Sequence, residues 1–265
     1  MTTLAAIIPT HNGRAFIARA LDSALAQDAP ADEIVVVDDA STDGTADLVA
    51  ERYPTVRLVR LPRNVGSGAA RNAGVAASTG ELIAFLDHDD AWHPGYLAAQ
   101  RALFAGAPKA ILGRTGLTVI DDRRGIQSTI GVTPVADRDE TIRKLLCGQN
   151  PIVTLSVVAV RRPAFEQVGG FDPNLRVLND RDLYLKLIRS GGFTGTAQAL
   201  VTKYMHGDNL LFEKGGATWL AEHLAILDHF FADPAHDRFR PLEAEARRQA
   251  QARVEQALKS QRAQP

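Results

Sequence analysis

Three carboxylates within four residues are the part of this sequence with the clearest chemistry. Asp87, Asp89 and Asp90 follow directly on the apolar run Leu82–Leu86, which disfavours the alternative of an acidic surface turn. Half-buried carboxylates repel one another at a high cost unless a cation neutralises them. Asp87 and Asp89 both point to the same side of an extended backbone, so they can share one ion. Such hard oxygen ligands predict Mg²⁺ or Mn²⁺, which commonly bridges protein carboxylates and substrate phosphates.

Polar residues also follow two earlier apolar runs. The run Leu4–Ile8 opens into Pro9-Thr10-His11-Asn12, and Ile34–Val37 is followed by Asp38 and Asp39. In an open α/β sheet these positions lie at the carboxyl ends of strands, where ligands bind. Successive strand residues face opposite ways, so we expect one of the two aspartates to face a pocket and accept hydrogen bonds from a base or a ribose. A plain strand-to-helix turn and a helix cap are the respective alternatives.

A glycine-rich segment carries a basic candidate. Gly66 and Gly68 precede Arg71, and paired glycines at a helix start can cradle phosphates. However, Arg71 stands where a dinucleotide-binding loop has its third glycine, and the pair follows the third predicted strand rather than the first. We therefore expect the glycines to let a helix begin close to the sheet and Arg71 to reach an anion or a base. A structural salt bridge is the alternative for Arg71.

The elements that must position these residues follow from the apolar pattern. Short apolar runs alternate with helical patterns over the first ninety residues, which is typical of a parallel sheet with crossover helices. The predicted strands are Leu4–Ile8, Ile34–Val37, Val56–Leu61 and Leu82–Leu86, and helices are expected over about 16–25, 45–53 and 68–77. Apolar stretches at 110–120 and 154–160, a short apolar run at 199–201 and a helical stretch at 180–189 are expected to complete the same domain. This pattern predicts an α/β fold with a parallel sheet flanked by helices.

Composition excludes several classes of protein. The 30 basic and 31 acidic residues nearly balance, and 45% of the 265 residues are hydrophobic, which disfavours a disordered or nucleic-acid-coating chain. The single cysteine, Cys147, excludes an intramolecular disulfide and a multi-cysteine zinc site. The sequence begins without a basic leader, and no stretch reaches about 18 uninterrupted apolar residues. We therefore expect a cytoplasmic protein that binds no nucleic acid.

Together these segments resemble the family 2 glycosyltransferases, whose nucleotide-sugar-binding architecture is called GT-A. The resemblance implies an α/β fold with a mixed, mostly parallel sheet flanked by helices. The resemblance rests on four stretches in the order and rough spacing of the family, namely residues 7–12, 36–45, 64–74 and 85–90. It covers about the first hundred residues well and the next hundred moderately. It implies a metal site at Asp87 and Asp89, which also bind the ribose, and a nucleotide site in which Thr10 and Asp39 hold the base. The implied nucleotide-binding residues are Pro9, Thr10, His11, Asn12, Asp39, Arg71, Asp87 and His88.

The second half of the resemblance supplies a catalytic base. Residues 169–172 read Gly-Gly-Phe-Asp, after which the family has a Glu-Asp pair that opens a helix. Asp180 corresponds to the aspartate of that pair, which is typically the base, whereas Asn179 replaces the glutamate. Without the resemblance, Asp180 and Asp182 would be interpreted as acids that complement a helix dipole. His206 matches a histidine that lies close to the diphosphate and is a metal ligand in some members; a structural histidine is the alternative.

The expected organisation follows from this resemblance. Residues 1–215 should form the GT-A domain, with 1–90 as the nucleotide-binding half and 91–215 as the acceptor half. Residues 216–265 should form a helical extension with a thin apolar stripe at spacings of three and four, made of Phe239, Leu242, Ala246, Ala250, Val254 and Leu258. Packing on the domain is the first interpretation of this extension. A homodimer contact, partner docking and peripheral attachment to an anionic membrane through its arginines stay open.

The predicted function is the inverting transfer of a sugar from a nucleotide diphosphate, with a UDP-sugar favoured, to a hydroxyl of a glycan or glycoconjugate. Bacterial polysaccharide or glycoconjugate synthesis is the expected setting, with Mn²⁺ or Mg²⁺ as cofactor. A catalytically weak scaffold that binds nucleotide sugars is the first alternative, because Asn179 departs from the family pattern. A nucleotidyltransferase is the second, although the first loop lacks the glycine-rich basic cluster that a triphosphate needs.

Overall fold

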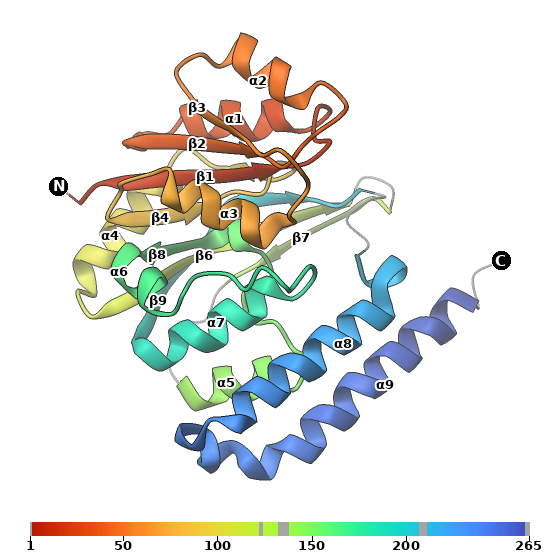
Figure 1. The fold of residues 1–265 in the computed structure, drawn as a ribbon. Helices are drawn as coiled ribbons and strands as arrows, with labels where there is room; N and C mark the ends of the chain where they lie inside the picture. The colour runs from red at the N-terminus through yellow and green to blue at the C-terminus, as the bar shows by residue number, and fades with distance from the viewer. Residues whose placement is uncertain (1, 122–123, 132–137, 207–210, 263–265) are drawn as a thin grey trace.

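The computed structural model describes residues 2–121, 124–131, 138–206 and 211–262. Its strands form one mixed sheet in the order β3-β2-β1-β4-β8-β6-β9-β5, with β7 paired to β6. Within the described chain, β5, β7 and β8 run opposite to the other strands. Helices pack on both faces of this sheet, as Figure 1 shows. The predicted α/β class with a mixed, mostly parallel sheet is therefore confirmed.

The N-terminal half follows the predicted alternation of strands and helices. Its elements are β1 (Leu4–Thr10), α1 (Ile17–Leu25), β2 (Glu33–Asp38), α2 (Thr45–Arg52), β3 (Arg57–Arg60), α3 (Ser67–Ala76) and β4 (Leu82–Phe85). Strand β1 pairs in parallel with both β2 and β4, so Ile7 lies between Val35 and Phe85. All three residues are fully buried, as the continuous apolar runs require. Because the strand order reverses at β1, the carboxyl ends of β1, β2 and β4 surround a topological switch point.

Two glycines explain how α3 lies so close to the sheet. Gly66 stands before the helix at φ +89, a conformation that L side chains rarely adopt. A Cβ on Gly74 would approach the Ile7 side chain to 2.5 Å, so a larger residue there would push the helix off β1. The sequence pattern assigned this role to Gly66 and Gly68. In the structure Gly68 instead allows a close approach to Asn179, at 3.2 Å from a built Cβ.

The second half departs more from the sequence-based expectations. Its elements are β5 (Ala91–Trp92), α4 (Tyr96–Gly106), β6 (Ala110–Asp121), β7 (Ile126–Ile130), α5 (Arg138–Leu146), β8 (Val158–Arg161), α6 (Arg162–Gln167), α7 (Asn179–Ser190) and β9 (Gly192–Tyr204). The apolar stretch 154–160 is only partly a strand, because Leu155–Val157 forms a 3₁₀ turn before β8. The short apolar run 199–201 lies inside the much longer β9, whose first seven residues include two glycines and two threonines and show no continuous apolar run.

The C-terminal part is helical, as predicted. It consists of α8 (Leu211–Ala232), the 3₁₀ segment η3 (Pro234–Leu242) and α9 (Glu243–Arg262), so the first helix begins before residue 216. Helices α8 and α9 lie side by side, beyond α5 and α7 from the sheet (Figure 1). Four positions of the predicted stripe are buried, namely Phe239, Ala246, Ala250 and Val254. Packing is therefore the observed use of the stripe, whereas the dimer and membrane contacts and the division at residue 216 stay predictions.

No helix in the described part of the chain is long and apolar enough to cross a membrane.

Candidate active site

A cavity of about 270 Å³ lies at the switch point of the sheet. It is lined by the ends of β1, β2 and β4 and by the start of α3, through Pro9, Thr10, His11, Asp39, Asn64, Gly66, Ser67, Ala70, Arg71, Asp87, His88 and Asp89. The lining thus brings together the residues predicted to hold a nucleotide, with one exception. Asn12 lies outside it and accepts a hydrogen bond from the backbone N–H of Thr42 at 2.9 Å. Parallel strand ends are the reason that segments 30 to 80 residues apart meet here.

Asp39 closes the side of the cavity next to α3. Its two carboxylate oxygens accept the backbone N–H groups of Val65, at 2.7 Å, and Gly66, at 2.8 Å. Asp38 turns the other way and accepts the backbone N–H of Ser41 at 3.1 Å. The divergence of the two carboxylates therefore follows the strand alternation. In this geometry Asp39 shapes the cavity by holding the 65–66 loop as well as lining it.

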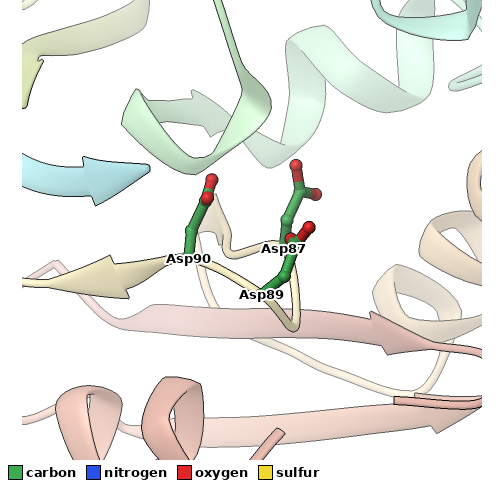
Figure 2. Close-up of side chains that lie close together, drawn as sticks. All are labelled: Asp87, Asp89 and Asp90. Atoms are coloured by element: carbon green, nitrogen blue, oxygen red, sulfur yellow. The ribbon is translucent and has the colours of Figure 1, made fainter. Parts of the chain in front are cut away.

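The acidic cluster stands on the loop after β4. Asp87, Asp89 and Asp90 extend to the same side of this loop (Figure 2), and one carboxylate oxygen of each lies within 4.8 Å of the others. Asp90 is fully buried and accepts a hydrogen bond from the Ser156 hydroxyl at 2.6 Å. Burial raises the pKa of Asp90 to about 7, and the Asp87 and Asp89 charges add to this rise, whereas Lys203 and the hydrogen bond from Ser156 oppose it. Three such carboxylates cannot all be ionised cheaply without a cation.

Lys203 is one of the cations that the chain itself supplies to this cluster. Its Nζ lies 3.8 Å from Asp90, and its side chain is largely buried. Burial lowers the pKa of Lys203, but Asp90, Asp87, Asp89 and Asp180 raise it by more, so the amine stays charged. Lys203 and the Arg71 guanidinium, which lies 2.6 Å from Asp87, are two positive charges against three carboxylates, so the cluster stays acidic when all three are ionised. The cluster therefore fits a divalent ion held by hard oxygen ligands, and Asp87 and Asp89 are the partly exposed members that could reach it.

His206, two residues after the end of β9, joins this cluster. Its Nε2 lies 2.9 Å from a carboxylate oxygen of Asp89, and its ring stacks on Phe16 with centroids 4.5 Å apart. The ring contact orients the imidazole toward the carboxylate. The structure thus brings His206 to the predicted metal site.

Arg71 links the acidic cluster to the second half of the domain. One terminal nitrogen donates to Asp87 at 2.6 Å and the other to the Asn179 amide oxygen at 3.3 Å. Burial raises the pKa of Asp87, but Arg71 and Lys203 outweigh burial and hold that pKa below its ordinary value. The salt bridge that the sequence left as an alternative is therefore present, and it lies inside the cavity wall. Asn179 stands where the family pattern has a glutamate, and its neutral amide oxygen accepts the hydrogen bond from Arg71.

Asp180 stands next to this link, in the first turn of α7. One carboxylate oxygen accepts the backbone N–H of Arg181 at 2.7 Å, and the other accepts the side-chain amide of Asn150 at 3.0 Å. Burial raises the pKa of Asp180 above its ordinary value, although Arg181, Arg71 and the two hydrogen bonds oppose the shift. Asp180 does not line the 270 Å³ cavity; it directly follows Asn179, which accepts a hydrogen bond from Arg71. This arrangement suits a base that faces a second substrate rather than the nucleotide.

Two residues that the sequence did not assign have a place in this site. Lys203 follows the buried Val201 by two residues, so strand alternation could have placed it on the inward face of β9. Asn150 carried no recognisable signal, because its contact with Asp180 joins a loop and a helix that are thirty residues apart. Contacts of this kind are set by packing alone.

A larger cavity, of about 580 Å³, lies between α5, α7 and the C-terminal helices. Two of its arginines are paired with acids, Arg189 with Asp233 at 2.5 Å and Arg238 with Asp139 at 2.7 Å, and Arg138 donates to the backbone carbonyl of Arg189. Volume alone therefore does not locate the chemistry of this protein.

Comparison with known proteins identifies the family. The model described as Glycosyl transferase family 2 matches residues 5–169. The chain belongs to this family. The predicted glycosyltransferase class is thereby confirmed, and the matched residues include the whole 270 Å³ cavity and the acidic cluster.

The relatives of this family-2 chain include bacterial proteins of polysaccharide synthesis. It is 47% identical over 108 residues to the succinoglycan biosynthesis protein ExoO of Rhizobium meliloti, covering 40% of this chain and 31% of ExoO. It is 30% identical to the putative teichuronic acid biosynthesis glycosyltransferase TuaG of Bacillus subtilis, covering 70% of this chain and 71% of TuaG. The chain therefore spans less than a third of ExoO and most of TuaG.

Solved structures share the fold of this glycosyltransferase-family chain. S. aureus TarS in complex with UDP-GlcNAc superimposes with a TM-score of 0.67 at 20% identity, covering 85% of this chain and 66% of that one. The mannosyltransferase PcManGT from Pyrobaculum calidifontis, in complex with GDP-Man and Mn²⁺, gives 0.65 at 21% identity, covering 100% and 76%. The GT-A architecture expected from the sequence is therefore confirmed.

Proposed function

We propose that this chain is an inverting glycosyltransferase that moves a sugar from a nucleotide diphosphate to a hydroxyl of a glycan or glycoconjugate. The observation that carries the proposal is the arrangement around Arg71. Arg71 donates to Asp87 of the acidic cluster in the cavity wall and to Asn179, and the partly buried carboxylate of Asp180, the next residue, stands outside the lining of that cavity. Two different substrates can therefore approach a common point from two sides.

In the proposed reaction Asp180 accepts the proton of the acceptor hydroxyl. The hydroxyl oxygen then forms a bond to the anomeric carbon of the sugar, while the bond to the diphosphate oxygen breaks and its electron pair leaves with the nucleoside diphosphate. A single displacement of this kind inverts the anomeric configuration. General-base help is typically worth about 10²–10⁴-fold in rate. The raised pKa of Asp180 suits this task, because a more basic carboxylate takes a proton more readily.

The leaving diphosphate needs positive charge near it. Asp87 and Asp89, with His206, are the residues that would hold Mn²⁺ or Mg²⁺, and such an ion would neutralise charge on the diphosphate. Arg71 and Lys203 add fixed positive charge on the protein side. Thr10, Asp39 and the other lining residues would hold the base and the ribose within the cavity.

A UDP-sugar is the favoured donor, and polysaccharide synthesis is the proposed setting. TarS, with which this chain shares its fold, was solved with UDP-GlcNAc, and ExoO and TuaG are named for the synthesis of succinoglycan and teichuronic acid. Within this proposal residues 1–90 form the donor half and residues 91–215 form the acceptor half.

The test is a thermal-shift screen followed by a turnover assay. UDP, GDP, dTDP and CMP are each added with Mn²⁺, Mg²⁺ or a chelator, and the matching nucleotide sugars are then tested for release of the nucleoside diphosphate. Metal-dependent stabilisation by one diphosphate is expected, worth roughly 2.7 kcal/mol at a hundred times its dissociation constant. Binding without any turnover would favour a scaffold, and release of pyrophosphate would favour a nucleotidyltransferase.

A further inference from the structure

We propose that Glu222, on the C-terminal helix α8, is a positioning residue for Asp180. This inference rests on the role proposed above for Asp180 as the base. Glu222 is 42 residues further along the chain and touches no residue of the nucleotide cavity in the contacts of the described residues. Its effect on the reaction would therefore pass through the backbone that leads into α7.

The Glu222 carboxylate binds three consecutive backbone N–H groups. One oxygen accepts the N–H of Arg176 at 2.6 Å, and the other accepts those of Val177 at 2.9 Å and Leu178 at 2.8 Å. Only 8% of Glu222 is exposed. A buried carboxylate is costly unless it is hydrogen-bonded in this way, and charge-assisted bonds are the stronger kind. The positive end of the α7 dipole, immediately after these residues, favours the charge further.

These three N–H groups belong to the segment that sets the direction of α7. Leu178 is the N-cap of that helix, and Asn179 and Asp180 are its first two residues. A segment before a helix has no ladder to satisfy its N–H groups, so another acceptor must do so. By binding all three, Glu222 fixes the position of the backbone just before α7. It thereby fixes the backbone position from which the Asp180 side chain extends.

His223, the residue after Glu222 on α8, binds a second backbone segment near Asp180, residues 146–150. His223 is neutral, because burial and the nearby Arg181 guanidinium lower its pKa to about 4. Its Nδ1 accepts from Arg181 at 2.9 Å, so its Nε2–H donates to the backbone carbonyl of Leu146, also at 2.9 Å. Arg181 donates in addition to the Gly148 carbonyl at 3.0 Å.

The 146–148 segment leads directly to Asn150, whose amide donates to Asp180 at 3.0 Å. Glu222 and His223, adjacent on α8, thus secure the two segments on either side of the proposed base. The C-terminal helices are therefore part of the machinery that orients Asp180, rather than an appendage that only packs against the domain.

The decisive variant is Glu222→Gln, with Asp228→Asn as its matched control. A glutamine keeps the shape of the side chain, but in either orientation its NH₂ group faces at least one of the three N–H donors. Asp228 is an exposed acid on the same helix, paired to Arg247 at 2.6 Å. We expect kcat to fall by about 10- to 100-fold in Glu222→Gln, since a misplaced catalytic group can cost about 10²-fold. The KM for the nucleotide sugar and the thermal shift with UDP and Mn²⁺ should stay as in the wild type, and Asp228→Asn should retain full kcat.

Two further measurements separate positioning from a general loss of stability. The acid limb of the kcat–pH profile should move in Glu222→Gln, because the surroundings of Asp180 change. In an Asp180→Asn background, Glu222→Gln should cause no additional loss of kcat, since a residue that acts through the base cannot act without it. A further loss in the double variant, or a kcat within twofold of the wild type in the folded single variant, would overturn the inference.

Hydrogen exchange on the wild-type chain gives a test that does not depend on any variant folding. The amides of Val177 and Leu178 should exchange slowly, in step with the core of α7. Exchange of these amides at the rate of an open loop would contradict the inference. The outcomes also separate the two proposals: if Asp180→Asn keeps its turnover, the proposed base is wrong, whereas loss in Asp180→Asn without loss in Glu222→Gln removes only the positioning role.

Discussion

The two halves of this domain place their site residues by different means. In the first half, Thr10 and Asp39 stand at or directly beyond the ends of β1 and β2, and Asp87 and Asp89 follow closely on β4. Parallel pairing alone brings these ends together. In the second half, Asp180 lies in the first turn of α7. The backbone just before this helix is bound by Glu222 of α8, and the Asp180 carboxylate is bound by Asn150, in a loop thirty residues earlier.

This difference separates local placement from tertiary placement. A residue at a strand end needs only the sheet to form correctly. A residue at a helix start that is secured by side chains from other elements needs each of those contacts. Changes in the cavity wall of the first half should therefore affect donor binding, whereas changes around Asp180, or loss of the metal site at Asp89, should affect turnover.

The largest expected effect is that of Asp180→Asn. The substitution keeps the shape of the side chain but removes the proton acceptor, so kcat should fall by about 10²–10⁴-fold. Donor binding, measured by the thermal shift with UDP and Mn²⁺, should stay unchanged because Asp180 lies outside the nucleotide cavity. Unchanged turnover in this variant would exclude Asp180 as the base.

The next effect concerns the acidic cluster. Asp89→Asn should abolish the metal-dependent part of the thermal shift and lower kcat by about 10²–10³-fold, a typical cost of losing one electrostatic contact to a leaving group. Asp47→Asn, an exposed acid on α2 paired to Arg60, serves as the control and should behave as the wild type. If the chelator has the same effect on Asp89→Asn and on the wild type, the metal site lies elsewhere.

A smaller effect is expected at Asp39. An amide in Asp39→Asn cannot accept both the Val65 and the Gly66 N–H groups, so the wall of the cavity loosens. A lost hydrogen bond to a charged group is worth about 1.5–3 kcal/mol, which corresponds to a KM for the donor raised by roughly 10- to 100-fold. Because Asp180 is untouched, kcat should change much less. A fall in kcat at constant KM would contradict the division between the two halves.

The smallest effects concern pH. A base must be ionised, so activity should be lost as pH falls through the pKa of Asp180, at a higher pH than for an ordinary aspartate. The raised pKa also means that ionised Asp180 destabilises the folded protein at neutral pH, and that this cost disappears as pH falls below its pKa. Asp180→Asn should therefore raise the Tm at neutral pH, and the gain should shrink on acidification. A gain that is independent of pH would show that Asp180 is not the group that titrates.

Much of the donor site could be predicted because its signals are local. The runs before Pro9, Asp38 and Asp87 are continuously apolar, as buried parallel strands require, and polar residues directly beyond such runs must meet at one edge of a sheet. The buried stripe from Phe239 to Val254 could be predicted equally well, since helical spacing alone identifies a buried face.

The sequence by itself thus determined the order of the first strands and helices, the acidic cluster at a strand end and, through its resemblance to a family, the position of a candidate base. Only the tertiary structure decided that Lys203 neutralises part of that cluster, that Asn179 serves Arg71, and that α8 secures the entry to Asp180. The physical reason is the range of the interactions. The periodicity of a helix or strand depends on residues that are close in sequence. The partners of a buried charge, in contrast, are brought to it only when distant elements pack together.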